Sequence, residues 1–154
     1  MSAEKNKAII HRLVRAEEIG DFTTVDELTA PNYVYHNPAN PEVRTHEEHK
    51  QKVLVGLRTA FPDLKIVIED TIAEGNKVVI RFTFRGTHKG EYAGIAPTNK
   101  RIEFTAINIF RLADGKVAEQ WVESNPLSML LQLGVVPLPA GYFHIREQKD
   151  RRDA

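Results

Sequence analysis

The chain has 154 residues, 42% hydrophobic and 27% charged, which is enough for one core and too little for two comfortable domains. Its 21 basic and 21 acidic residues balance, so it lacks the net positive charge of a protein that binds nucleic acid or an anionic membrane. No cysteine occurs, which excludes disulfides, a thiol nucleophile and a thiolate metal site. The N-terminus is charged, and no stretch approaches the roughly 20 apolar residues of a membrane span. We therefore expect a cytoplasmic protein whose partner is a small molecule or another protein.

The first 60 residues predict three helices separated by clear end signals. Gly20 ends the first helix, and Asp21 caps the second. After a strand-like run at residues 32–38, Thr45 and Glu48 have the spacing of a capping box, which opens the third helix. The helices are expected at residues 3 to about 19, 22–28, and 46 to about 60.

Beyond Pro62 the spacing of apolar residues changes from 3.6 to 2, which indicates strands. Two strands are joined by a tight turn at residues 74–77. Along the second strand Ile80, Phe82 and Phe84 share one face, whereas the residues between them are polar. The sheet is therefore expected to bury one face and to leave the other in water.

A further hairpin and a helix complete the pattern. A third strand turns at Asp114-Gly115 into the last one, and Asn125-Pro126 begins a helix that ends before Gly134. Helices, then antiparallel strands, then a helix define an α+β fold, in which the curled antiparallel sheet packs on the N-terminal helices and leaves a conical cavity. We assign residues 1–144 to this single domain and residues 145–154 to a charged, flexible tail.

Five short motifs support a resemblance to a known family. They are Phe61-Pro62-Asp63, Gly86-Thr87-His88-x-Gly90, Pro97-Thr98-x-Lys100, Arg111 to Lys116, and Gln132-Leu133-Gly134. In this combination the chain resembles the SnoaL-like polyketide cyclase (ester cyclase) family, within the nuclear transport factor 2-like fold. The resemblance implies a cone-shaped α+β barrel, usually dimeric, with a ligand pocket in the cone. It also implies ring closure by intramolecular aldol condensation, without cofactor or metal.

The hairpin at Asp114-Gly115 predicts which side chains face this pocket. A three-residue loop sets a register in which directly paired residues share one face. The predicted pairs are Ala106 with Val122, Asn108 with Gln120, and Phe110 with Ala118. Because this face is apolar apart from its two amides, we assign Asn108, Gln120, Phe110 and Val122 to substrate binding.

The pocket departs from the family at two positions. The resemblance implies an acid/base Asp at the position of Val122 and a His at the position of Asn108. Valine carries no proton, and asparagine hydrogen-bonds but does no acid/base work near pH 7. A one-residue shift of the alignment would place Glu119 or Glu123 there instead, but it would also turn Trp121 inward.

Two histidines are the remaining candidates for proton transfer, because an imidazole exchanges its proton near physiological pH. His88 continues the alternation of Ile80, Phe82 and Phe84, which predicts a place on the inner face near the mouth of the cone. The alternative is that His88 hydrogen-bonds a backbone carbonyl group and shapes the following loop. His36 is the second candidate.

The segment Tyr35 to Pro38 resembles the family segment whose Asn contacts substrate. The resemblance implies that Asn37 binds substrate, and we add its neighbour Tyr35. Because side chains alternate along a strand, only one of His36 and Asn37 can face inward. The alternative for Asn37 is a local role as the turn residue that precedes Pro38.

His46 and His49 lie one helical turn apart, a spacing that also occurs in metal sites. They sit in the charged first turn of a helix, where a third ligand is lacking. We therefore expect a solvated helix face and no metal.

The outer face of the last hairpin is unusually apolar. Trp121, Ile107 and Ile109 lie there, which predicts a homodimer interface or, as the alternative, packing under a loop of the same chain. Tyr142 and Phe143 are expected to cap the cone or to cross to the other subunit.

These observations leave three hypotheses. The first is a cofactor-independent cyclase or isomerase of a polyketide-like carbonyl compound, in which His88 or His36 moves the proton while Asn37, Asn108 and Gln120 hydrogen-bond the developing enolate. The second is a non-catalytic ligand-binding or accessory protein that retains the pocket. The third is a dimerisation module whose own side chains fill the cavity.

Overall fold

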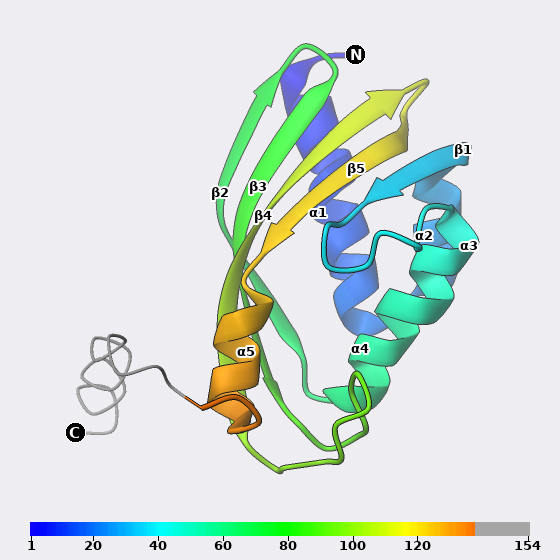
Figure 1. The fold of residues 1–154 in the computed structure, drawn as a ribbon. Coiled ribbons are helices and arrows are strands. Elements are labelled where there is room, and N and C mark those ends of the chain that lie inside the picture. The colour runs from blue at the N-terminus through cyan, green and yellow to red at the C-terminus, as the bar shows by residue number, and fades with distance from the viewer. Residues whose placement is uncertain (138–154) are drawn as a thin grey trace.

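A five-stranded sheet is the frame on which the site is built, in a computed structural model that describes residues 1–137. The strands, in the order in which they lie in the sheet, are β1 (Thr29–His36), β5 (Lys116–Ser124), β4 (Arg101–Ala113), β3 (Lys77–Thr87) and β2 (Lys65–Glu74). The sheet curls without closing, so β1 and β2 are its edges (Figure 1). The predicted α+β class is confirmed.

One strand pairs in a direction that the sequence did not predict. β1 runs parallel to β5, whereas all the other neighbouring strands are antiparallel. The sheet is therefore mixed rather than wholly antiparallel. Alternation of apolar and polar residues shows which side chains share a face, but it carries no information on the direction of pairing.

Helices lie along the concave side of the sheet (Figure 1). Their bounds are α1 (Ala3–Ile19), α2 (Phe22–Leu28), α3 (His46–His49), a π-helical turn η1 (Lys50–Leu54), α4 (Val55–Ala60) and α5 (Pro126–Leu133). The predicted end signals are confirmed: Gly20 ends α1 with a φ of 76°, Asp21 accepts a hydrogen bond from the N–H of Thr24, and Asn125 caps α5. Within residues 1–137 no helix is long and apolar enough to cross a membrane.

The predicted third helix is confirmed, with one unpredicted irregularity. Thr45 and Glu48 form both hydrogen bonds of the capping box. The π-helical turn then interrupts the helix, which continues as α4. A capping box marks only where a helix begins, so the widened turn left no signal in the sequence.

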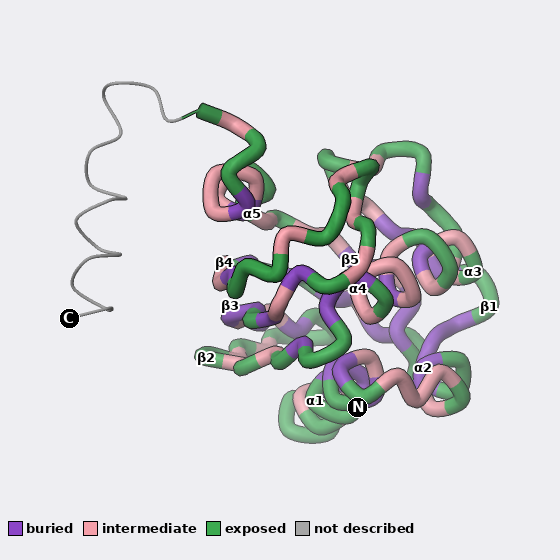
Figure 2. The backbone as a smooth tube through the Cα atoms, turned by 90° about the horizontal axis from the view of Figure 1, so that it is seen from below, coloured by how far each residue is buried: buried purple, intermediate pink, exposed green. Residues whose placement is uncertain are grey.

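Two hydrophobic clusters fill the space between helices and sheet. The first lies toward the β2–β3 and β4–β5 turns and contains Ile10, Val78 and Phe110, all with 0% exposure. The second lies at the opposite end of the strands and contains Phe61 and Leu133. Buried positions line the inner side of the fold and exposed ones its outside (Figure 2).

The β4–β5 hairpin corrects the predicted register. Its turn has two residues, Asp114 and Gly115, with φ values of 50° and 76°, rather than three. A bulge on the β5 side of Arg111 then adds one residue. The shorter turn and the bulge together move the pairing by two, so Asn108 lies opposite Val122 and Phe110 opposite Gln120. Because a shift of two preserves alternation, the predicted residues still share the inner face.

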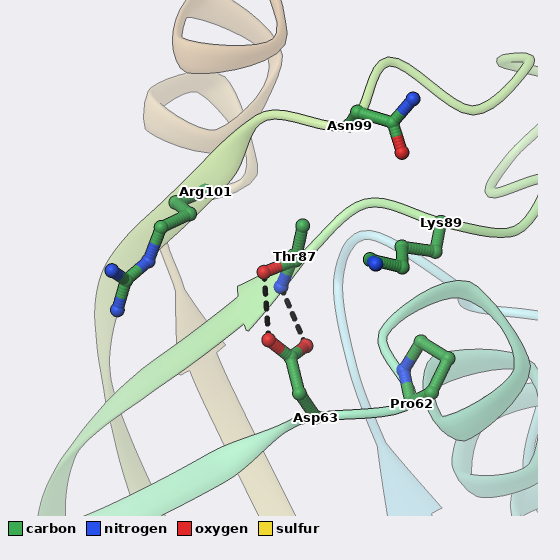
Figure 3. A pocket seen from close by; sticks show the side chains of 6 residues that line it. All are labelled: Pro62, Asp63, Thr87, Lys89, Asn99 and Arg101. Atoms are coloured by element: carbon green, nitrogen blue, oxygen red, sulfur yellow. Dashed lines mark hydrogen bonds between the residues drawn. The ribbon is translucent and has the colours of Figure 1, made fainter.

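Residues of two family motifs, Phe61-Pro62-Asp63 and Gly86 to Gly90, form the contacts that hold the end of the sheet beyond β3. The carboxylate of Asp63 accepts hydrogen bonds from the backbone N–H and the hydroxyl of Thr87, each at 2.7 Å (Figure 3). The carbonyl oxygen of Ala60 accepts the N–H groups of Lys89 at 2.8 Å and Gly90 at 3.1 Å. These contacts hold the end of α4 against the end of β3.

We expect Gly90→Ala to weaken the contact between the end of α4 and the end of β3 and so to destabilise the protein. A Cβ atom at Gly90 would lie 2.3 Å from the carbonyl oxygen of Thr59, in a backbone held by the contacts above. The clash should lower the free energy of unfolding by about 2 kcal/mol, measured by urea denaturation. Gly56→Ala in α4 is the matched control: nothing lies within 4 Å of its added Cβ, so stability should rise by up to about 1 kcal/mol. If the two variants were equally stable, the contact of Gly90 with the end of α4 would not contribute to stability as proposed.

The end of the predicted domain at residue 144 and the tail at residues 145–154 lie outside the described residues. Tyr142 and Phe143 lie outside them as well.

Candidate functional site

Two hollows in the described part of the chain are candidates for a ligand site. One is an open surface hollow of about 560 Å³ that includes Asp63, Thr87, Lys89 and Arg101 (Figure 3). Its Asp63 and Thr87 already bond to each other. The other is a cavity of about 150 Å³ between the helices and the concave face of the sheet. Ligand sites are typically concave and apolar with a few convergent polar groups, so we take the inner cavity as the candidate site.

The inner cavity draws its walls from both hydrophobic clusters. Its polar lining residues are Glu17, Tyr35, Asn37, Asn40, His49, Arg58, Tyr92, Asn108, Gln120 and Ser124. Aromatic side chains of β3 and β4, Phe82, Phe84 and Phe104, form much of its apolar surface. The third hypothesis, a cavity filled by the protein's own side chains, finds no support in this open space.

Most of the predicted substrate-binding residues meet in this lining. Tyr35, Asn37, Asn108, Gln120 and Val122 all line the cavity. Their roles in binding stay predictions, but the structure brings them together from β1, β4 and β5 and from the loop after β1.

Phe110 is the predicted binding residue that does not reach the cavity. It lies on the inner face as expected, but it is fully buried in the first hydrophobic cluster. Toward the β4–β5 turn the space between helices and sheet is filled by packed side chains. Alternation along a strand predicts which residues face inward, but it does not predict how far the cavity extends along the strand.

A hydrogen-bonded group of three residues contributes His49 and Gln120 to the cavity lining. The hydroxyl of Tyr33 donates to Oε1 of Gln120 at 2.7 Å and lies 3.3 Å from Nδ1 of His49. Because a hydroxyl has one hydrogen, which goes to Gln120, Nδ1 of His49 donates to the Tyr33 oxygen. In the neutral ring Nε2 is then a bare acceptor. The ring of Tyr35 stacks on His49 with ring centres 4.1 Å apart, and its hydroxyl accepts a hydrogen bond from Asn37 at 3.0 Å.

Asn108 offers an unused acceptor in the wall of the cavity. The residue is 8% exposed, and its Oδ1 has no hydrogen-bond partner among the described residues. A buried polar atom without a partner is costly in a folded protein.

Glu17 is the functional candidate that the sequence analysis missed. It lies in the last turn of α1 and lines the cavity, and its carboxyl group makes no hydrogen bond or ion pair within residues 1–137. Burial raises the pKa of its carboxyl group to about 8. A signal existed in the sequence: Ile10, Leu13, Val14 and Glu17 follow helical spacing, which places an acid on the buried stripe.

The neighbouring Glu18 is in the opposite situation. Burial acts to raise the pKa of Glu18, but hydrogen bonds from the N–H of Ile66 at 2.8 Å and from Lys65 at 3.1 Å outweigh it and hold the pKa below the usual value. Its partners therefore keep Glu18 ionised, whereas Glu17 has none.

His49 was expected on a solvated face, and this expectation is wrong. The side chain is buried, with 5% exposure, and it lines the cavity. Burial, with a smaller contribution from His46, lowers the pKa of His49 to about 3, so the ring is neutral. His49, Val53 and Leu57 follow one another at four-residue spacing, a buried stripe that the sequence already contained. Within residues 1–137 no group of three or more His, Cys, Asp or Glu side chains could hold a metal ion.

His88 lies behind the cavity wall rather than in the lining. It is fully buried (0% exposed) beside Phe61, with ring centres 5.5 Å apart. Its Nδ1 accepts a hydrogen bond from the backbone N–H of Thr98 at 3.2 Å. The contact ties the end of β3 to the loop before β4, which is a loop-shaping role, though through an N–H group rather than the expected carbonyl group. Its proton-transfer role stays a prediction.

His36 lies on the other side of the sheet. Its ring stacks on Trp121 with centres 5.3 Å apart, and its Nε2 lies 2.9 Å from Oε1 of Glu119. Since side chains alternate along β1, His36 points outward where Tyr35 and Asn37 reach the cavity. His36 is therefore not among the cavity's lining residues, and its proton-transfer role also stays a prediction.

The fold and the cavity define a class: an open, curled α+β sheet that holds a small-molecule pocket against its helices, the nuclear transport factor 2-like fold. The family model for SnoaL-like polyketide cyclase matches residues 8–133, and the chain belongs to this family.

Characterised relatives and solved structures agree with this assignment. The chain is 31% identical over 125 residues to nogalonic acid methyl ester cyclase of Streptomyces nogalater. The aligned region covers 79% of this chain and 92% of that protein. It is 29% identical over 140 residues to aklanonic acid methyl ester cyclase DnrD of Streptomyces peucetius, spanning 87% and 94%. The crystal structure of AclR from Streptomyces galilaeus, proposed to be a hydroxylase, is similar with a TM-score of 0.79 at 30% identity, covering 88% of this chain and 100% of that one. IdmH of Streptomyces antibioticus, proposed to be a polyketide cyclase, gives 0.74 at 33% identity, covering 84% and 98%.

The raised pKa of Glu17 predicts a pH-dependent stability. In the unfolded chain this carboxyl ionises near pH 4.5, whereas in the folded protein it ionises only near pH 8. Its contribution is therefore fully present below pH 4.5 and is lost as the pH rises through about 8. The free energy of unfolding of Glu17→Gln, relative to that of the wild type, should therefore rise by about 4 kcal/mol from pH 5 to pH 9, measured by urea denaturation.

Glu4→Gln, an exposed change in the same helix, is the matched control. Its stability difference from the wild type should stay constant over this range. A constant difference for Glu17→Gln as well would show that Glu17 ionises normally in the folded protein.

Proposed function

We propose that this protein is a cofactor-independent enzyme that closes a ring in, or isomerises, a polyketide-like carbonyl compound held in the inner cavity. The observation that carries the proposal is the set of neutral amides, Asn108, Gln120 and Asn37, in a lining that is mostly aromatic and aliphatic. An enolate oxygen formed there would receive hydrogen bonds from fixed donors, which stabilise developing charge better than water does. The aromatic walls suit a flat, conjugated substrate.

The alternative is a non-catalytic ligand-binding or accessory protein. It is favoured by Val122, which lines the cavity at the position where the resemblance implies a catalytic Asp. In this alternative the amides bind a ligand, and no proton is transferred.

The test uses the substrates named for the relatives, nogalonic acid methyl ester and aklanonic acid methyl ester. We expect the wild-type protein to convert at least one of these esters. The conversion is measured by chromatography and by the change in absorbance. Asn108→Leu, which removes a hydrogen-bonding amide at similar volume, should lower kcat/KM about 100-fold. Thr105→Val, an exposed change on the same strand, should leave the rate unchanged.

Binding without conversion would favour the accessory protein. In that case Val122→Asp, which restores the carboxyl group implied by the family, should produce measurable ring closure from an inactive starting point. If the wild type neither binds nor converts either ester, the proposed substrate class is wrong.

We propose further that the protein forms a homodimer through the outer face of the sheet. Strand register aligns an apolar row there, made of Ile72, Val79, Ile109 and Trp121, with His36 stacked at its end. Ile72 is 65% exposed and Ile109 37% exposed, and large apolar patches of this kind usually have a partner. Ile109→Lys should weaken self-association at least about tenfold in sedimentation equilibrium. Ile19→Lys changes an isoleucine on α1 that is 51% exposed, and it should leave self-association intact. A monomeric wild type would contradict the dimer.

The cytoplasmic location expected from the sequence stays a prediction.

A further inference from the structure

We propose that Glu17 is the general base, and then the general acid, of the cavity, in place of the Asp that the family carries at the position of Val122. The inference rests on the proposed function, since it names the group that moves the proton in that reaction. The two positions belong to different walls: Val122 lies on β5, whereas Glu17 lies on α1. The acid/base group has thus moved from the sheet to the helix.

Glu17 is the only carboxyl group in the cavity lining formed by residues 1–137. It keeps part of its accessible surface, as expected for a side chain that borders a void. Its charge contributes to the raised pKa values of Tyr33 and Tyr35, after the larger effect of their burial. The carboxyl group therefore lies within electrostatic reach of the two phenols beside Asn37 and Gln120.

Glu17 has no structural role that would explain its place. A carboxyl group that borders an apolar cavity without a hydrogen-bond partner costs stability. Glu18, one residue on, anchors α1 to β2, where Nε2 of His11 also lies 2.7 Å from the hydroxyl of Thr71, so this contact does not depend on Glu17. Where a residue breaks the rules of packing without compensation in the fold, a functional role is the physical explanation.

The other ionisable groups around Glu17 do not change charge near neutral pH. His49, from α3, has a pKa of about 3, and Tyr35, from β1, has a pKa of about 12. Burial also raises the pKa values of Tyr33 and of Tyr92, in the loop after β3. The guanidinium group of Arg58, on α4, donates to the carbonyl oxygen of Glu18. Glu17 is thus the one acid on this lining whose pKa lies near the operating pH, which is what general acid–base catalysis requires.

The reaction balances with this single group. The Glu17 carboxylate removes a proton from the carbon beside a carbonyl group, which breaks a C–H bond and leaves an enolate hydrogen-bonded by the amides of Asn108 and Gln120. The enolate carbon then forms a C–C bond to a second carbonyl carbon. The oxygen of that second carbonyl takes the proton from Glu17, and the carboxylate is restored.

The first step can be tested without the natural substrate. The probe is 2-tetralone, a bicyclic aromatic ketone, and the readout is exchange of its α-protons for deuterium in D₂O, followed by ¹H NMR. We expect the wild-type protein to accelerate the exchange, with a rate that rises with pH and levels off above about pH 8, because the base is the carboxylate.

Glu17→Gln should lower the protein-dependent rate at least about 100-fold and change the affinity for the probe by less than about threefold. Glu17→Asp, which keeps the carboxyl group on a shorter chain, should retain part of the rate. Glu4→Gln is the matched control and should behave as the wild type. A merely structural role would alter affinity or folding but would leave the pH profile of the remaining rate unchanged.

The carboxyl ¹³C resonance of Glu17, assigned by its loss in Glu17→Gln, gives a second readout in the ligand-free protein. We expect it to titrate near pH 8. The proposal is overturned if this resonance titrates near pH 4.5, if the wild type does not accelerate exchange, or if Glu17→Gln exchanges as fast as the wild type. Failure of the proposed function would give a different result. Deuterium exchange of 2-tetralone would still depend on Glu17, but neither methyl ester would be cyclised.

Discussion

The anchored carboxylate of Glu18 sets how the first helix lies on the sheet. It accepts the N–H of Ile66 on the edge strand β2 and pairs with Lys65, so one side of α1 is held to a fixed point of the backbone. Consecutive residues project about 100° apart around a helix. Fixing Glu18 therefore fixes the direction of Glu17, which reaches the cavity rather than solvent or the sheet. The same contact also covers part of an exposed strand edge, which open sheets need.

The residues that identify the family and the residues that line the cavity are largely different sets. Asp63, Thr87, His88 and Gly90 belong to the motifs, and all of them fasten helix ends and loops to the end of the sheet. The cavity instead uses residues on regular elements between those fasteners. A family can therefore keep its motifs, and with them the shape of the cone, while the chemistry of the lining changes. In the mechanism proposed above, the valine at position 122 and the glutamate at position 17 are such a change.

Burial has the same effect on three ionisable groups of the cavity, His49, Tyr35 and Glu17. It favours the neutral form, which lowers the pKa of His49 and raises those of Tyr35 and Glu17. Histidine and tyrosine are thereby moved away from neutral pH, whereas a glutamate is moved toward it. The same environment thus keeps His49 and Tyr35 in one protonation state near neutral pH, so that they act as hydrogen-bonding groups. It brings the pKa of Glu17 close to neutral pH.

The sequence by itself determined the helices and their caps, the α+β class, and the shared inner face of Asn108, Gln120 and Val122, because these follow from local spacing and alternation. It did not determine the register of the last hairpin, where a two-residue turn and a bulge compensate each other, nor the parallel pairing of β1 with β5. Only the tertiary structure decided which inward residues border a void. Phe110 is packed and Asn108 is not, and His36 and His88 stand outside the lining while Glu17 and His49 enter it. The physical reason is that burial is set by the distance between helices and sheet at each level of the cone, a long-range quantity that no local pattern records.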